Sequence, residues 1–343
     1  MANLEQSCAG DVSSAVSGAR TGGKLDVFLT VDVEVWCDGW LDIDRKFPDA
    51  FRRYVYGPTA RGQYGLPYTL HELAEHGLAG SFFVEPLFST RFGIEPLGEI
   101  VTLIRDAGQE IQLHLHTEWV DEARTPLLRD VTGKKQFLRY FSLAEQTQLI
   151  GLGARLLEQV GEAGINAFRA GSFGFNRETL DALAANRIAF DSSYNASASG
   201  PDSGVVPGAL LVEPIACAGI HEYPLTVFRD GRGALRPAQV TACSFAEMEG
   251  LLWQALERGR RSFVILSHNF EMMNLAKNRP DDIVVNRFRK LCRFLSRNAD
   301  SFRVRGFRGL NGVSVEAQPE PLTVPLWKTS LRIVEQALRR RYG

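Results

Sequence analysis

Apolar runs that suit β-strands alternate with helical stretches along most of the chain. The runs are rich in β-branched and aromatic residues and lie at 27–34, 80–87, 110–116, 167–169, 188–191, 262–268 and 303–306. Between them, apolar residues recur at helical spacing, at 66–76, 97–107, 143–162, 177–186, 244–258 and 281–298. This alternation predicts an α/β domain over residues 25–312, with a parallel sheet covered by helices.

Two segments inside the domain interrupt this alternation. Residues 36–64 form a polar and aromatic stretch that is too long for an ordinary loop, so we expect it to be partly structured or functional. Residues 197–236 are rich in Gly and Pro, which predicts irregular structure with short strands.

The two ends of the chain differ from the domain. Residues 1–24 are rich in Ala, Gly and Ser and are expected to form a disordered leader. They lack the basic start and apolar core of a signal peptide, which favours a cytoplasmic location. Residues 313–343 are expected to be an extension with an amphipathic helix, whose apolar side consists of Leu326, Trp327, Leu331, Val334 and Leu338.

The apolar side of this C-terminal helix has two interpretations. It can pack against the domain, or it can contact a partner or a membrane surface. The helix ends in Arg339-Arg340-Arg341, and these cations would hold the chain peripherally at an anionic membrane in the second case.

Composition narrows the classes of function. Of the 343 residues, 45% are hydrophobic and 23% are charged, which is typical of a globular protein. A formal net charge of −1 provides no overall positive field, so we expect no nucleic-acid partner. The five cysteines are far apart and include no Cys-x-x-Cys pair, so they give no indication of a thiolate zinc site.

Carboxylates gather at the end of the first predicted strand. Because side chains alternate along a strand, Thr30, Asp32 and Glu34 share one face. Two carboxylates on an otherwise apolar strand are costly to bury unless another charge compensates them. A divalent cation is the simplest compensation, and the alternative is that Glu34 already lies in a solvated loop.

The strand at 110–116 repeats this spacing with histidines. His114 and His116 point the same way, whereas Leu113 and Leu115 point into packing. Neutral imidazole suits zinc and other first-row divalent ions, so the pair predicts a metal site. Glu118, two positions further on, is a candidate oxygen ligand.

Polar side chains also end three later strands. His268 ends the apolar run 262–268, Arg169 ends 167–169 and Asp191 ends 188–191. In a barrel of parallel strands, catalytic groups gather at the carboxyl ends of the strands. A structural ion pair is the alternative for Arg169 and Asp191, but the convergence of five such strand ends favours one catalytic centre.

Taken in order, these motifs resemble those of the polysaccharide deacetylases, a carbohydrate esterase family that includes chitooligosaccharide and peptidoglycan deacetylases. Residues 30–34 resemble its Thr-x-Asp-Asp motif or the Asp-Val-Asp/Glu variant, and 108–114 resemble Gly-His-Glu-Ile-x-x-His. Residues 168–174 resemble Arg-x-Pro/Gly, 190–193 resemble Tyr-Asp-Ser-Ser and 266–268 resemble Leu-x-His. With the strand at 80–84, the resemblance covers about residues 26–310.

The resemblance implies a distorted, incomplete (β/α) barrel of about seven parallel strands. It implies a metal-dependent hydrolase that removes N-acetyl groups from an amino sugar or polysaccharide precursor. The implied metal is zinc, with cobalt or nickel as alternatives, held by Glu34, His114 and His116.

The resemblance also implies catalytic roles for four residues. Asp32 would be the general base and Arg169 the partner that holds it, while His268 would be the general acid. We expect Asp191 to orient His268.

Two positions depart from the family pattern. Val33 replaces the second Asp of the first motif, so Glu34 would have to supply that ligand. Glu118 stands at the position of the family's second histidine, which leaves the third ligand open between His116 and Glu118. The shared strand face favours His116.

The expected partner is an acylated carbohydrate, and the aromatic candidates for stacking on a sugar ring are Trp36, Trp40, Tyr54, Tyr56 and Tyr64. Local packing is the alternative for these rings. Two other functions remain open: a C–N hydrolase acting on a small amide, and an inactive carbohydrate-binding relative. The departures at Val33 and Glu118 permit the second.

Overall fold

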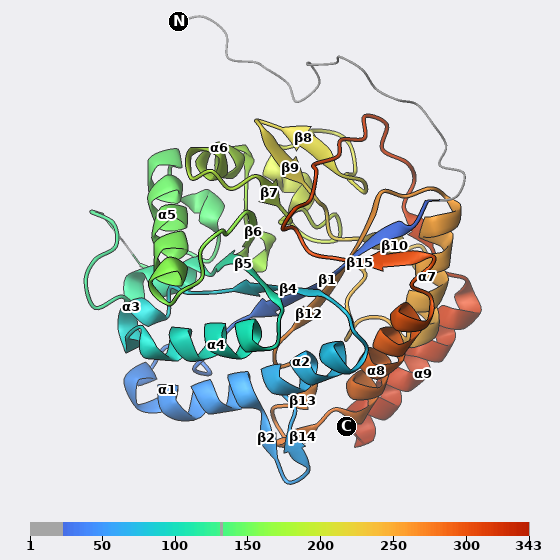
Figure 1. Ribbon diagram of the computed structural model, residues 1–343, viewed down its shortest axis with the longest axis horizontal. Helices are drawn as coiled ribbons and strands as arrows, with labels where there is room; N and C mark the ends of the chain where they lie inside the picture. Colours follow the sequence, from blue (N-terminus) through green and yellow to red (C-terminus); the bar gives the residue numbers. More distant parts are fainter. Residues whose placement is uncertain (1–22, 131–132, 343) are drawn as a thin grey trace, which may run out of the picture.

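A curled, mostly parallel sheet forms the centre of the protein (Figure 1). The computed structural model describes residues 23–130 and 133–342, so nearly all of the predicted leader lies outside the described residues. The strand order is β12 (Ser262–His268), β1 (Leu25–Val33), β4 (Gly80–Val84), β5 (Glu110–Leu115), β6 (Ala167–Ala170), β7 (Phe190–Asp191), β9 (Ile220–Glu222) and β8 (Ile215–Cys217).

All pairs along this order are parallel except β8 with β9, and β15 (Phe302–Val304) adds a further parallel partner to β1. Seven strands therefore run parallel in one continuous path, and the sheet curls without closing (Figure 1). The predicted α/β class and incomplete barrel are confirmed.

Alternation along the strands sorts side chains between two cores. On β1, Phe28 belongs to an inner cluster with residues such as Phe83, Val264 and Phe307. Its neighbours Val27 and Leu29 belong to the larger cluster between the sheet and the helices. Thr30 and Asp32 continue the inward series by the same two-residue period, and they are the polar end of an otherwise apolar interior.

The predicted helices surround the sheet within a few residues of their expected bounds: α2 (Leu66–Glu75), α4 (Glu95–Asp106), α5 (Leu143–Gln159), α6 (Arg177–Ala185), α7 (Phe245–Glu257) and α8 (Asp282–Arg297). Side chains at their starts explain the bounds. At Ser142 and Ser244, the hydroxyl accepts from the third helical N–H while a Glu three residues later accepts from the cap.

The insertion at 36–64 is structured, as expected for part of it. It contains α1 (Ile43–Phe51), a π-helical turn (Arg52–Tyr56) and the hairpin of β2 (Pro58–Thr59) and β3 (Gly62–Gln63). Phe47 of α1 stacks on Phe92 of α3 (Ser89–Phe92) with ring centroids 3.7 Å apart. This contact fixes the insertion beside the carboxyl ends of β1 and β4.

Short elements make up the other connections. They are the 3₁₀ turns Thr117–Glu122, Leu138–Tyr140, Gly171–Phe173 and Gly200–Ser203, the hairpin of β13 (Met273–Asn274) and β14 (Arg279–Pro280), and β10 (Val227–Arg229), β11 (Leu235–Pro237) and β16 (Leu322–Thr323). The last three form a small sheet, so β16 ties the C-terminal extension to the irregular segment 197–236.

The extension ends in α9 (Leu326–Tyr342), which packs on the outer side of the α7–α8 layer (Figure 1). The interpretation that its apolar side packs against the domain is wrong, because Trp327 is 59% exposed and Leu331 58%. The buried side is polar instead: Thr329 is fully buried, and Arg332 pairs with Glu247. None of the described helices combines the length and apolarity needed to span a membrane.

Candidate metal centre

The register of the sheet brings the predicted residues together at one edge. On neighbouring strands, Asp32 pairs with His268 and His114 pairs with Arg169. Glu34 follows directly after β1 and is 7% exposed, so the alternative of a solvated loop position is excluded. Parallel strands place their carboxyl ends at the same edge, which is why residues more than 200 positions apart meet there.

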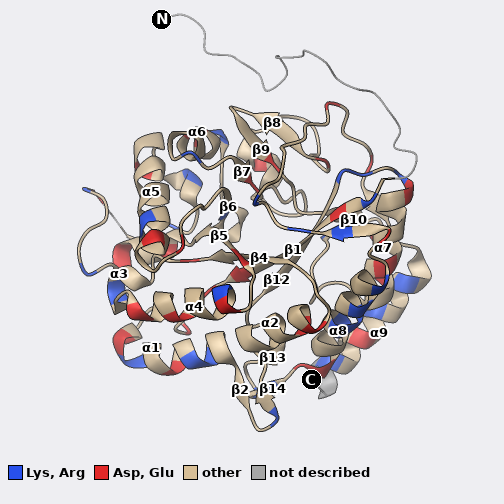
Figure 2. Ribbon diagram, in the orientation of Figure 1, with Lys and Arg blue, Asp and Glu red and all other residues tan. Residues whose placement is uncertain are grey.

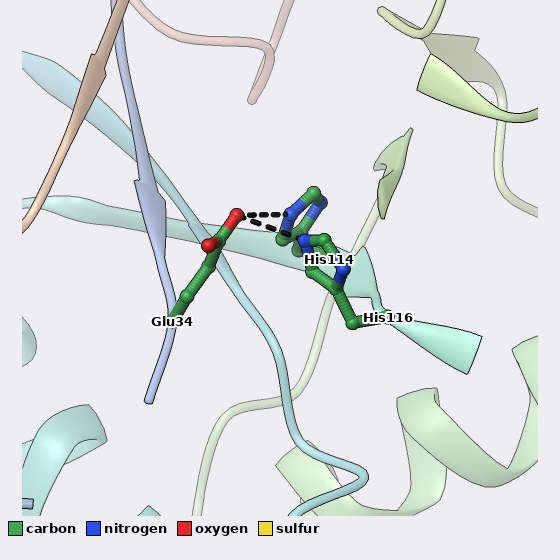
Figure 3. Close-up of side chains that lie close together, drawn as sticks. All are labelled: Glu34, His114 and His116. Carbon is green, nitrogen blue, oxygen red and sulfur yellow. Dashed lines mark hydrogen bonds and ion pairs between the residues drawn. The ribbon is translucent and has the colours of Figure 1, made fainter. Parts of the chain in front are cut away.

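Glu34, His114 and His116 form the buried cluster shown in Figure 3. The Oε1 atom of Glu34 lies 3.2 Å from Nε2 of His114 and 2.9 Å from Nε2 of His116. Three candidate ligand atoms therefore converge within 4.8 Å of one another. One carboxylate and two imidazoles are a donor set that suits zinc and other first-row divalent ions.

The outer ring nitrogens of both histidines are occupied. Nδ1 of His114 lies 2.7 Å from the carbonyl oxygen of Arg169, and Nδ1 of His116 lies 3.2 Å from Oε2 of Glu118. A carbonyl oxygen only accepts, so His114 carries its proton on Nδ1 and keeps Nε2 free to coordinate. Metal-binding histidines typically have a carbonyl or carboxylate at the other nitrogen. Glu118 lies behind His116, and this geometry favours His116 as the third ligand.

Two neighbours, Trp36 and Gly171, shape the cluster in ways that the sequence does not predict. The indole of Trp36 donates to Oε2 of Glu34 at 2.6 Å, which leaves Oε1 facing the imidazoles. Gly171 packs against the ring of His116: a Cβ atom there would lie 2.7 Å from Nδ1 of His116 and 2.6 Å from the Leu115 carbonyl oxygen. Any side chain at Gly171 would push this ring out of position.

The charges in the cluster are strongly coupled. Burial acts to raise the pKa of Glu34, but the imidazoles of His116 and His114 hold it well below its usual range. Burial acts to lower the pKa of His116, yet Glu34 and Glu118 raise it well above its usual value. A cation at this point would displace protons from the imidazoles.

Asp32 is held by a fully buried arginine. Nη1 of Arg169 donates to Oδ1 of Asp32 at 2.6 Å and to Oγ1 of Thr30 at 2.9 Å. The rest of the guanidinium is fixed by Ser192, whose carbonyl oxygen and hydroxyl each accept at 3.0 Å. The guanidinium compensates the buried carboxylate without a metal.

His268 lies next to Asp32, and one ligand atom each of Asp32, Glu34 and His268 lies within 4.8 Å of the other two. Its Nε2 is 3.9 Å from Oε1 of Glu34, and its Nδ1 is 2.8 Å from Oε1 of Glu271. Burial acts to lower the pKa of His268, but the hydrogen bond and charge of Glu271 raise it to about 9. The imidazole therefore holds a proton at neutral pH.

The expectation that Asp191 orients His268 needs correction, because Glu271 occupies that place. Asp191 accepts from Oγ of Ser193 at 2.5 Å and faces Glu222 on the neighbouring strand. Burial raises the pKa of Asp191, and burial together with Asp191 raises that of Glu222 well above its usual range. Oγ of Ser193 also accepts from the backbone N–H of Ala170, so Asp191 supports the end of the strand that carries Arg169.

A further buried carboxyl, Glu85, follows β4 near the cluster. Its oxygens accept from the backbone N–H groups of Leu87 and Phe88 at 2.7 and 3.2 Å. Burial raises the pKa of Glu85 to about 8. A single Glu after an apolar strand resembles any helix-start residue, so the sequence offered no signal for it.

The candidate aromatic residues separate into two groups. Trp36 is half-buried and perpendicular to His116, with ring centroids 4.7 Å apart, and Trp40 packs beside Trp36 at 6.0 Å. The three tyrosines pack locally: Tyr54 against Phe270, Tyr56 against Phe51 and Glu99, and Tyr64 against Tyr68. The two tryptophans also have local partners, since both pack on Trp119, but they are the rings that lie beside the cluster.

Comparisons with known proteins bear on the fold. No protein-family model matches the chain, and no curated protein matches it. A solved Mycobacterium smegmatis protein provisionally assigned as a polysaccharide deacetylase aligns with 90% of this chain and 99% of its own, at 20% identity and a TM-score of 0.53. A family 4 carbohydrate esterase from Streptomyces lividans in complex with acetate covers 87% of this chain and 98% of its own, at 12% identity and a TM-score of 0.41. By its likeness to the mycobacterial structure, the chain has the fold of the polysaccharide deacetylases.

Proposed function

We propose that this chain is a metal-dependent hydrolase that removes N-acetyl or other N-acyl groups from an amino sugar or polysaccharide precursor. One observation carries the proposal. The cluster of Glu34, His114 and His116 adjoins a carboxylate held by arginine, Asp32, and a histidine held by Glu271, His268. A metal site next to a base and an acid suits metal-assisted amide hydrolysis.

Glu34, His114 and His116 would hold the metal, which is zinc in this proposal, with cobalt or nickel as alternatives. The fit rests on the two Nε2 atoms, which converge on Oε1 of Glu34, while both Nδ1 atoms have other partners. When bound, such an ion lowers the pKa of a coordinated water toward ~7 and polarises the acyl carbonyl.

Asp32 acts as the general base that takes the proton of the attacking water. The guanidinium of Arg169 contacts only Oδ1 of Asp32 among its two oxygens, at 2.6 Å. Arg169 is fully buried and fixed at four positions, so it orients Asp32 and compensates its charge throughout the reaction.

His268 acts as the general acid that protonates the leaving amine. Glu271 at Nδ1 leaves the other nitrogen, Nε2, facing the cluster. With a pKa raised to about 9, the imidazole is charged at neutral pH and can donate that proton. A general acid typically contributes ~10²–10⁴-fold to the rate.

An acylated carbohydrate is the proposed substrate. Its ring would contact Trp36 and Trp40, which are half-buried beside the cluster. Aromatic faces suit the apolar faces of sugars, and the indole of Trp36 is already oriented by its hydrogen bond to Glu34.

The test is acetate release from N-acetylated chitooligosaccharides before and after chelation. Activity should disappear with the chelator and return with zinc, cobalt or nickel. A small amide or imide serves as the second substrate, and preferential hydrolysis of it would overturn the sugar assignment. Activity that is indifferent to chelation would contradict the metal-dependent mechanism.

A further inference from the structure

Four large apolar residues on the outward side of α9 are exposed to solvent, and Nζ of Lys328 lies 5.6 Å from the centroid of the Trp327 ring. Trp327 is 59% exposed, Leu331 58%, Val334 58% and Leu338 49%. We call these four residues the α9 seam. We propose that the α9 seam packs against the same seam of a second copy of this chain, as an antiparallel pair of helices.

The spacing of the seam fits a helix better than a lipid surface. Its residues follow one another at intervals of four, three and four, which is the heptad repeat of paired helices. Such a stripe is narrow, whereas a helix that lies in a membrane interface presents a broad apolar face. Ser330 and Ala337, both exposed, flank the seam and are small enough for close approach.

The charges of α9 support the same occupant. Arg332 pairs with Glu247 and Asp230 at 3.4 and 3.7 Å, and Nζ of Lys328 donates to the carbonyl oxygen of Ala246 at 2.8 Å. These cations are turned toward the domain, along the α7–α9 region where Figure 2 shows basic and acidic residues interspersed.

The charged side chains at the C-terminal end of α9 also face the domain: Arg339 pairs with Asp281, and Glu335 pairs with Arg287. Over 326–339, the described charged side chains thus have partners in the domain. A helix bound to anionic lipid would place cations beside its apolar face. The α9 seam itself is uncharged, and Lys328 and Glu335 beside it carry opposite charges, so an identical antiparallel seam meets it without like-charge repulsion.

Charge also selects the orientation. The helix ends in Arg339-Arg340-Arg341, and parallel pairing would bring two such ends together. Antiparallel pairing separates them and aligns the helix dipoles favourably. With the two-fold axis between Leu331 and Val334, Trp327 lies opposite Leu338 of the second copy.

The helix is held firmly enough to present the seam. Thr329 is fully buried and its Oγ1 accepts from the N–H of Gly231 at 2.9 Å. Leu326 packs so closely on Gly231 that a Cβ atom there would lie 2.2 Å from the Leu326 Cα. The seam spans roughly 17 Å at 1.5 Å per residue. It would form the centre of a two-fold interface, which commonly buries about 800 Å² per partner.

Analytical ultracentrifugation of the full chain over a range of concentrations tests the proposal. The wild type should dimerise, and the double variant Leu331→Asp with Val334→Asp should be monomeric with an unchanged circular dichroism spectrum. Leu41→Asp is the matched control, because Leu41 is 81% exposed but lies outside the seam, and this variant should still dimerise.

Cross-linking tests the orientation. The double variant Trp327→Cys with Leu338→Cys should form covalent dimers under mild oxidation, whereas Trp327→Cys alone should not. Dimers of the single variant would indicate parallel helices and overturn the antiparallel arrangement.

Two results would overturn the proposal as a whole. A wild type that stays monomeric at every concentration contradicts it. The proposal is also contradicted if the wild type is a monomer that sediments with vesicles of phosphatidylcholine and phosphatidylserine, and if the double variant Leu331→Asp with Val334→Asp loses this binding. The seam would then be a lipid-binding surface. Neither readout depends on the hydrolase activity.

Discussion

Two buried acidic clusters lie at the carboxyl ends of strands in the same sheet. The pKa values of their carboxyl groups are shifted in opposite directions. Glu34 faces two imidazoles and an indole N–H, which hold its pKa well below the usual range despite burial. Asp191 and Glu222 face each other, and burial raises the pKa of both. The first cluster presents ligand atoms suited to a cation, whereas burial in the second favours the protonated form of the acids.

The difference teaches that a buried carboxylate at a strand end does not by itself indicate catalysis. The neighbours decide its role. Around Glu34 they are the imidazoles of His114 and His116, whose Nε2 atoms converge on Oε1 of Glu34. Around Asp191 they are a second acid and the hydroxyl of Ser193, which together stabilise the strand that carries Arg169.

Removing the negative charge from each cluster should give the largest contrast. Glu34→Gln should lose the metal and nearly all hydrolase activity, because the amide is a weak ligand. The matched variant Glu222→Gln should keep both, since the amide resembles the protonated acid. Metal content by mass spectrometry and acetate release are the measurements. Equal losses in the two variants would contradict the distinction drawn here.

The acid–base pair should show the next largest effects. Asp32→Asn and His268→Ala should each lower kcat by about 10²–10⁴-fold while the fold and the bound metal are kept. Asp191→Asn should cost much less, because Asp191 contacts neither group directly. Steady-state kinetics with circular dichroism as the folding control distinguish these outcomes. Activity that survives both of the first two variants would refute their roles.

Glu118 should affect metal binding more weakly than His116. His116→Ala removes a ligand and should abolish tight binding, whereas Glu118→Gln alters only the partner of Nδ1. Loss of such an outer partner typically weakens metal affinity by ~10–100-fold. Competition with a chromophoric chelator measures both. If Glu118→Gln abolishes binding and His116→Ala does not, Glu118 is the third ligand.

Glu271 should set the alkaline limit of activity. The carboxylate raises the pKa of His268 to about 9, so the protonated acid is lost as the pH rises through that value. In Glu271→Gln this pKa falls, and the alkaline limb of kcat against pH should move to lower pH. An unshifted limb would show that another group controls it.

The smallest effect should be on stability. Because folding raises the pKa of Glu222, its contribution is fully present below the unfolded pKa and is lost as the pH rises through the folded pKa. The free energy of unfolding of the wild type should therefore fall with rising pH above the unfolded pKa. This slope should be smaller in Glu222→Gln, as measured by urea denaturation at several pH values. Parallel slopes would argue against a retained proton.

The sequence alone predicted the fold closely because its strands and helices carry strong local signals. The strand over 262–268 has the bounds that its apolar run predicts, and the helix predicted over 244–258 is observed over 245–257. The clustering of His114 with Glu34 followed from alternation along parallel strands.

Other features depend on contacts that no local pattern encodes. Glu271 lies three residues beyond His268 in a loop, and its role is visible only once that loop folds back. Glu222 lies in the Gly- and Pro-rich segment, where the sequence predicts irregular structure with short strands but not which strand lies beside Asp191. The sequence predicts the apolar side of α9 but not its orientation. This side faces outward because the opposite side of the helix forms ion pairs with the domain, such as that of Arg332 with Glu247.

Anomalous diffraction at the zinc edge, from crystals of the metal-loaded protein, tests the central claim most directly. The account predicts one strong peak about 2.0–2.2 Å from Oε1 of Glu34 and from Nε2 of His114 and His116. A peak confined to Glu72, Glu75 and His76 at the C-terminal end of α2, or no peak at all, would contradict it.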